Sequence, residues 1–181
     1  MPSKNKPVKY DLLIWGTIKK YKGIDKFLDY LYKHHLQNKY KIYITGSVSP
    51  PSYKNKLNRY LNENIKLYDE FLTFEQLAEI ASESLIILFP YIERSVLSSG
   101  ALMDSLVLGP HIIGPDTGAF KDLKNEGIIE TYTHYDDLIK KIDLFVKTGT
   151  KNSVSVSEFI EENSWQNFSH KINNWLVNIL P

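Results

Sequence analysis

Short apolar runs alternate with amphipathic stretches along most of this chain. "YDLLIWG" (10–16) and "YKIYITG" (40–46) are apolar runs that end in glycine, which is typical of strands buried in a parallel sheet. Between them, from Gly23 to Leu36, apolar side chains recur at helical spacing. The chain therefore opens with a predicted strand, helix and strand.

The same alternation continues through the middle of the chain. "NIKLYD" (64–69) predicts a third strand, and "SLIILFP" (84–90) predicts a central strand that is stopped by a proline with no amide hydrogen. Thr73 and Gln76 have the spacing of a capping box, which predicts a helix start and a helix that runs to about Ser82. A further short strand is expected at His111–Gly114, followed by the turn-rich segment "GPDTGAF".

Three more helices are expected, at 53–61, at 134–146 and, headed by a serine, at Ser164–Leu180. The polar stretch 147–157 between the last two is expected to be a loop. Strands that alternate with amphipathic helices favour an α/β fold, a Rossmann-like parallel sheet with helices on both faces and right-handed crossovers. No repeat or internal boundary divides it, so residues 1–181 are expected to form a single domain.

Composition supports this fold and excludes some chemistry. The 181 residues are 43% hydrophobic, enough for one core. The absence of cysteine excludes disulfides, thiolate zinc sites and a cysteine nucleophile. The histidines lack partners at metal-ligand spacing, so no metal site is predicted. No segment approaches the roughly 18 apolar residues of a membrane span, and a cytoplasmic location is expected.

Charge is divided unevenly between the two parts of the chain. Residues 1–66 carry a net charge of +10 and the remainder −9, although the total is only +1. A basic first third attracts phosphate, an anionic membrane surface or nucleic acid. A lysine-rich solvated surface is the plainer interpretation, and no nucleic-acid-reading motif accompanies the lysines.

In such sheets, ligands bind outside the carboxyl ends of the strands, near helix N-termini that favour anions. The segment 16–23 follows the first strand and offers Gly16 for close backbone approach and Lys22 as a charge for a phosphate; it is neither a P-loop nor a dinucleotide fingerprint. The segment "TGSVSP" follows the second strand, where its glycine either approaches a ligand or only makes a turn. Aromatic residues from Tyr68 to Phe71 are candidates to stack on a base.

The third candidate segment follows Pro90. If a helix begins near Ser98, the hydroxyls of Ser98 and Ser99 cap it, and the amides around Gly100 point outward to a charged group. Asp104 follows four residues later on the same face, where a carboxylate can accept two hydroxyl hydrogens from a sugar. A capped helix with an acid on its wet side is the simpler alternative.

The order of these pieces resembles a known family. "LLIWGTIKKYKGIDKFLDYL", "KIYITG", "NIKLYDEFLTFEQLAEIASESLIILFPY", "SSGALMDSLVLGPHIIGPDTGAFKDL" and a late "SW" look like the C-terminal, donor-binding half of a family 4 glycosyltransferase. Those are retaining enzymes with two Rossmann-like domains, the GT-B fold. The resemblance covers roughly Tyr10 to Leu180 and implies that an N-terminal acceptor domain is absent from this chain.

The resemblance assigns roles to several donor-binding residues. Gly16 matches the family's glycine after the first strand, and Lys22 matches the lysine that contacts the donor diphosphate. Thr17 stands where the family usually has an arginine. Asp104 matches the second of two glutamates, the one that binds ribose hydroxyls.

The first of those two glutamates falls on Val96, and Glu93, three residues earlier, is a possible sugar contact in its place. Ser98, Ser99 and Gly100 would then line the sugar and phosphate site, as in a branch of the family with a Ser-Gly pair. Thr117 and Gly118 match a loop that approaches the donor sugar, although a plain turn explains them as well.

The function implied is transfer of a hexose from a UDP- or GDP-sugar to a hydroxyl acceptor with retention, in polysaccharide or glycoconjugate biosynthesis. The nucleotide sugar is the substrate, and neither a resident cofactor nor a metal is expected. The chain alone is expected to bind a nucleotide sugar and transfer nothing, and peripheral contact with the inner face of the membrane would come through the absent domain. The alternatives are a non-catalytic sugar-nucleotide-binding or protein-interaction module and half of a related sugar-nucleotide epimerase.

Overall fold

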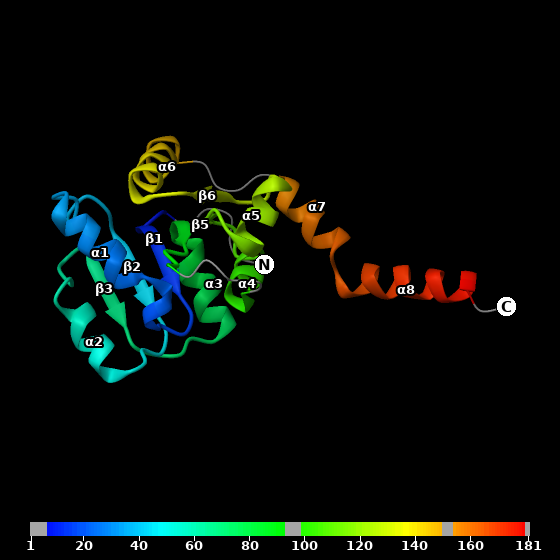
Figure 1. Cartoon of the computed structure of the whole chain (residues 1–181), viewed down its shortest axis with the longest axis horizontal. Helices are drawn as coiled ribbons and strands as arrows, with labels where there is room; N and C mark the ends of the chain where they lie inside the picture. Colours follow the sequence, from blue (N-terminus) through cyan, green and yellow to red (C-terminus); the bar gives the residue numbers. More distant parts are fainter. Residues whose placement is uncertain (1–6, 93–98, 150–153, 180–181) are drawn as a thin grey trace.

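A parallel six-stranded sheet forms the centre of the molecule. The computed structural model describes residues 7–92, 99–149 and 154–179 (Figure 1). The strand order is β3-β2-β1-β4-β5-β6, and every neighbouring pair is parallel, which confirms the predicted Rossmann-like sheet. The strands are β1 (Tyr10–Trp15), β2 (Ile42–Thr45), β3 (Ile65–Tyr68), β4 (Ser84–Leu88), β5 (His111–Pro115) and β6 (Glu130–Tyr132).

Helices cover both faces of this sheet. Buried side chains of α1, α2 and α6 share one core cluster with the sheet, and those of α3, α4, α5 and α7 share the other. The helices are α1 (Ile24–Lys33), α2 (Pro51–Asn58), α3 (Phe74–Ser82), α4 (Gly100–Ser105), α5 (Gly118–Asn125), α6 (Tyr135–Thr148), α7 (Val154–Glu162) and α8 (Trp165–Ile179), with a single 3-10 turn, η1 (Lys20–Lys22).

Burial on both faces explains why the strands read as continuous apolar runs. In β1, Leu12 and Ile14 pack into the first cluster while Leu13 packs into the second, and all three are almost completely buried. β4 is buried along its whole length, as expected for a central strand of a parallel sheet.

Helix starts follow the capping signals in the sequence. The Thr73 hydroxyl accepts a hydrogen bond from the Gln76 amide, and the Gln76 side chain accepts one from the Thr73 amide. This reciprocal pair confirms the predicted capping box. Ser99 likewise caps α4 by accepting a hydrogen bond from the amide of Leu102 at 3.3 Å.

Two predictions about local structure are wrong, and one strand was not predicted. The segment "GPDTGAF" is the end of β5 and the start of α5 rather than a turn alone, and Gly118 begins that helix with φ at +51°. The expected loop at 147–157 includes the first turn of α7, whose Val156 is buried against the sheet's second face. The three-residue strand β6 was not predicted; its pairing with β5 outweighs its weak local signal.

The last helix leads away from the rest of the molecule. In Figure 1, α7 turns away from the sheet and α8 projects beyond it. The side chains of Phe168, Ile172, Trp175 and Val177 are exposed along α8. Across the described residues, no helix combines the length and the apolar character that crossing a bilayer requires.

Candidate functional site

The strand order places a switch point between β1 and β4. The chain moves outward from β1 through β2 to β3, then returns to β4 beside β1 and moves outward in the other direction. The loops that follow β1 and β4 therefore leave the same edge of the sheet in opposite directions, which opens the crevice where such sheets bind ligands.

The two loops at this switch point are in direct contact and joined by a hydrogen bond. The amide of Ile92 donates a hydrogen bond to the carbonyl oxygen of Tyr21 at 3.1 Å. Gly23 has φ at +65°, and a Cβ there would lie 2.3 Å from the carbonyl oxygen of Pro90. A glycine is therefore required where the loop after β1 passes against the loop after β4.

Lys22 is the buried cation of this crevice. Its side chain is 4% exposed, its Nζ lies 3.4 Å from the carbonyl oxygen of Trp15, and it sits 5.4 Å from the centre of the Tyr91 ring. No carboxylate in the described part of the chain forms an ion pair with it. Burial lowers the pKa of Lys22 to about 8, because a buried ammonium loses hydration that favours its charged form.

Tyr91 connects Lys22 to the start of α4. Burial raises the pKa of Tyr91 to about 12, against the opposing effect of a hydrogen bond with the Ser99 side chain. The indole Nε1 of Trp15 donates to the Ser105 hydroxyl at 2.9 Å, and that hydroxyl donates to the Ala101 carbonyl oxygen at 2.6 Å. These bonds hold α4 against the end of β1.

As a result, Gly16, Lys22 and the first turn of α4 lie close together. A Cβ on Gly16 would lie 2.9 Å from Lys22 Nζ and 3.5 Å from the Cβ of Ala101. Because Gly16 has no side chain, nothing from this residue separates its backbone from the Lys22 ammonium and from the first turn of α4.

The loop after β2 packs against the loop after β1. Gly46 has φ at +134°, and a Cβ there would lie 2.1 Å from the carbonyl oxygen of Gly16. The amide of Ile18 donates a hydrogen bond to the Ser47 carbonyl oxygen at 2.8 Å, and the amide of Gly46 donates one to the Tyr68 carbonyl oxygen at 3.1 Å. Gly46 thus serves the close packing of two strand ends.

A small cavity of about 50 Å³ opens between the ends of β1 and β2, the loop after β3 and α3. It is lined by Trp15, Gly16, Thr45, Gly46, Glu70, Phe71, Leu72 and Leu77. Thr45 is 2% exposed, and its Oγ1 has no hydrogen-bond partner among the residues that the structure describes. Phe71 at the rim is 84% exposed, so the cavity combines a buried hydroxyl with an accessible aromatic ring.

A larger open hollow of about 700 Å³ lies between α4 and the last two helices. Met103, Val107, Phe159 and His170 are among its lining residues. None of its lining residues belongs to a strand end, so the hollow is separate from the crevice at the switch point.

The remaining predicted site residues are less closely associated with Lys22. Thr17 is exposed in the loop after β1, and Asp104 is exposed on α4, one turn after Gly100. Thr117 and Gly118 follow β5, the next strand beyond β4; the Thr117 hydroxyl is buried and, in residues 7–92, 99–149 and 154–179, has no hydrogen-bond partner. Glu93, Val96 and Ser98 lie outside the described residues.

Thr45, Glu70 and the role of Tyr91 are not predicted from the sequence. Thr45 is the only aliphatic hydroxyl in the strand "IYIT", and a small polar residue at the carboxyl end of a buried strand was the available signal. Nothing in the sequence distinguishes Glu70 from other acidic residues in loops; only its place in the lining of the cavity does so.

No protein-family model matches the chain, and no curated protein sequence matches it. Solved structures do. AviGT4, described as a glycosyltransferase involved in avilamycin A biosynthesis, matches with a TM-score of 0.60 at 10% identity, over 94% of this chain and 52% of that one. The chain therefore has the fold of a glycosyltransferase domain.

Two further solved structures agree. A glycosyltransferase from Rickettsia africae ESF-5 matches with a TM-score of 0.61 at 17% identity, over 81% of this chain and 38% of that one. The C-terminal domain of LpcC, a glycosyl transferase group 1 family protein from Francisella tularensis, matches with a TM-score of 0.60 at 15% identity. This match covers 78% of this chain and 77% of that one. The chain thus spans about half or less of the two longer neighbours and most of the single domain.

Proposed function

We propose that this chain is the donor-binding domain of a glycosyltransferase that uses a nucleotide-diphosphate sugar. The observation that carries the proposal is Lys22, a buried ammonium without an anionic partner in the described part of the chain, at the β1–β4 switch point. The fold shared with solved glycosyltransferases supports the same assignment.

The diphosphate is the group that Lys22 is suited to bind. A buried cation that loses its hydration gains most from an anion that enters beside it. The Gly16 backbone lies beside both the ammonium and the first turn of α4, whose N-cap is Ser99, so an incoming phosphate meets a charge near a helix start. During transfer, the same ammonium would stabilise the negative charge that develops on the leaving diphosphate.

The nucleoside would extend along the sheet edge towards β2 and β3. Gly16 belongs both to the neighbourhood of Lys22 and to the lining of the 50 Å³ cavity, so one ligand can reach both. We place the base at this cavity, against Phe71, and keep Asp104 as the ribose contact. Thr117 and Gly118 remain candidates for the donor sugar, together with Thr17 as a polar contact near the phosphates.

The complete reaction needs more than this chain supplies. In the proposal, a second domain provides the acceptor site, and a hexose passes from a UDP- or GDP-sugar to a hydroxyl with retention. The LpcC domain, which is described as C-terminal, supports placing this chain in the C-terminal half. Polysaccharide or glycoconjugate synthesis on the cytoplasmic side of the membrane is the setting that we propose for such an enzyme.

Calorimetric titration of the full chain with UDP, GDP and their sugars tests the assignment. We expect saturable binding of at least one nucleoside diphosphate, with weaker binding of the matching nucleoside because it lacks the phosphates that Lys22 contacts. If none of these ligands bound at millimolar concentration, the chain would be a non-catalytic interaction module and the proposal would fall.

A further inference from the structure

Two side chains in the cavity beside the switch point have hydrogen-bonding capacity that the protein does not use. Thr45 and Glu70 both line this cavity; the Thr45 hydroxyl is buried, and the exposed Glu70 side chain ends in a carboxylate. We propose that these two groups select guanine, so that the donor is a guanosine diphosphate sugar. This inference rests on the proposed function, because it assumes that a nucleotide sugar binds at this edge.

The strand register brings the cavity's wall together. Trp15 pairs with Thr45, and Thr45 pairs with Tyr68, as the last residues of β1, β2 and β3. The next residues, Gly16 and Gly46, pack closely against each other and line the cavity without adding a side chain to it.

Thr45 is an unusual residue for its position. It occupies the end of a completely buried strand, and side chains two residues apart on a strand share a face, so it follows Tyr43 towards the second core cluster. A buried hydroxyl that forms no hydrogen bond is costly to the folded protein. A ligand that supplies the missing partner removes that cost.

Glu70 contributes an uncompensated charge. Its neighbour Asp69 accepts a hydrogen bond from the Val48 amide at 2.8 Å and pairs with Lys54 at 2.8 Å. Glu70 is exposed and, among the described residues, forms no ion pair. Its carboxylate therefore has two acceptor oxygens available at the cavity.

Guanine is the common base whose edge best matches this pair. It presents two adjacent donors, N1–H and N2–H, to a carboxylate, and the neighbouring O6 accepts from a hydroxyl. Uracil offers one donor between two carbonyl oxygens, and adenine and cytosine place a ring-nitrogen acceptor beside their amino group. A carboxylate would face an acceptor in each of those three bases, and that contact is repulsive.

Size and aromatic surface agree with a base rather than a sugar. A volume of about 50 Å³ holds the edge of a planar ring but not a hexose. The ring of Phe71, 84% exposed at the rim, offers a face on which the rest of the base can stack.

The test is titration of the full chain with GDP, UDP and ADP, for the wild type and for Glu70→Gln. We expect the wild type to bind GDP at least about tenfold more tightly than UDP or ADP. In Glu70→Gln that preference should fall by a similar factor, because GDP loses its carboxylate partner while UDP, freed from the repulsion, binds at least as tightly as it does to the wild type. Glu63→Gln is the matched control, because Glu63 is also exposed but precedes β3 at its opposite end.

Thr45→Val and Thr45→Ser supply a second test that does not depend on Glu70. Valine keeps the shape and removes the hydroxyl, so GDP affinity should fall several-fold, whereas serine should restore most of it. Tighter binding of UDP than GDP, or a GDP preference that survives Glu70→Gln, would overturn this inference and leave the proposed function standing. Failure of every nucleotide to bind would overturn both.

Discussion

The Lys22 ammonium lies 5.4 Å from the centre of the Tyr91 ring, although the two side chains come from loops that follow different strands. The ring face offers the ammonium a weak attraction, while the only hydrogen bond it donates within the described residues goes to the Trp15 carbonyl at 3.4 Å. Lys22 is thus held in place without being neutralised.

Replacement of Lys22 by alanine should separate phosphate binding from nucleoside binding. We expect Lys22→Ala to weaken the binding of a nucleoside diphosphate by roughly 10- to 100-fold, the range of a charge-assisted hydrogen bond, and that of the nucleoside by less than about twofold. Lys20→Ala is the control, because Lys20 is exposed in the same short turn. Equal losses for the two ligands, measured by calorimetry, would contradict the assignment of Lys22 to the phosphates.

The lowered pKa of Lys22 predicts how binding depends on pH. Since that pKa is about 8, the ammonium loses its proton in the ligand-free protein as pH rises through 8. Affinity for the diphosphate should fall roughly tenfold between pH 7.5 and 9.5, a range in which the terminal phosphate, with a pKa of about 6, stays ionised. A flat profile in the wild type would exclude Lys22 as the phosphate contact, and Lys22→Ala should be flat.

Stability of the ligand-free protein should change in the opposite direction. In the folded chain, Lys22 releases its proton near pH 8, below the ordinary value of 10.5, so between these values the unfolded state binds more protons. The free energy of unfolding attributable to Lys22 therefore rises with pH above 8. Urea titrations between pH 8 and 9.5, before tyrosines titrate in the unfolded chain, should show this rise as a difference between the wild type and Lys22→Ala.

A methyl group at Gly46 should separate the ends of β1 and β2. Its Cβ would lie 2.1 Å from the Gly16 carbonyl oxygen, and neither backbone can move without breaking strand-end hydrogen bonds. Gly109→Ala is the control, since Gly109 also has a positive φ, at +95°, but open space around it. We expect Gly109→Ala to cost about 1 kcal/mol of unfolding free energy and Gly46→Ala about 2 kcal/mol more. Urea denaturation measures both costs. Similar costs for the two variants would show that the loops after β1 and β2 move apart to accommodate the methyl group.

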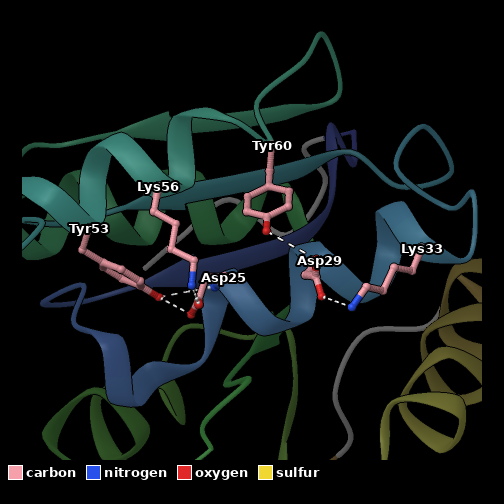
Figure 2. Close-up of polar contacts among 6 residues, drawn as sticks. All are labelled: Asp25, Asp29, Lys33, Tyr53, Lys56 and Tyr60. Carbon is pink, nitrogen blue, oxygen red and sulfur yellow. Dashed lines mark hydrogen bonds and ion pairs between the residues drawn. The ribbon is translucent and has the colours of Figure 1, made fainter.

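Two aspartates on α1 should differ sharply in their contribution to stability. As Figure 2 shows, Asp25 meets Tyr53 and Lys56 of α2, while Asp29, one turn later, meets Lys33. The Asp25 side chain is 1% exposed, whereas the Asp29 and Lys33 side chains are 40% and 71% exposed. Asp25→Ala should therefore cost about 3 kcal/mol, and Asp29→Ala less than about 0.5 kcal/mol.

Acid titration checks the Asp25 result independently. Burial raises the pKa of Asp25, but hydrogen bonds from Lys56 and Tyr53 outweigh it, and the pKa ends below its ordinary value. The stabilisation is therefore complete above about pH 4 and lost as pH falls through the folded-state pKa. The difference in unfolding free energy between the wild type and Asp25→Ala should shrink below pH 4; a constant difference would assign the effect to packing alone.

Much of the fold was readable from the sequence because its signals are local. Apolar runs ended by Gly16, Gly46 and Pro90 mark strands, and Thr73 with Gln76 and Ser99 mark helix starts, since each signal acts within a few residues. The segment 16–23 already indicated Gly16 and Lys22 as ligand-binding candidates, and the structure brings the two residues together. Helix α5 and strand β6 escaped prediction because their stability comes from pairing and packing with β5.

The sequence by itself determined most of the segments that become strands and helices and that a lysine follows the first strand. Only the tertiary structure decided what surrounds that lysine and what lines the cavity. Lys22 meets Tyr91 because β4 returns to the side of β1, and Thr45 and Glu70 line one cavity because β1, β2 and β3 end in register. Those contacts join residues many positions apart, so they depend on strand order and register, which no local pattern encodes.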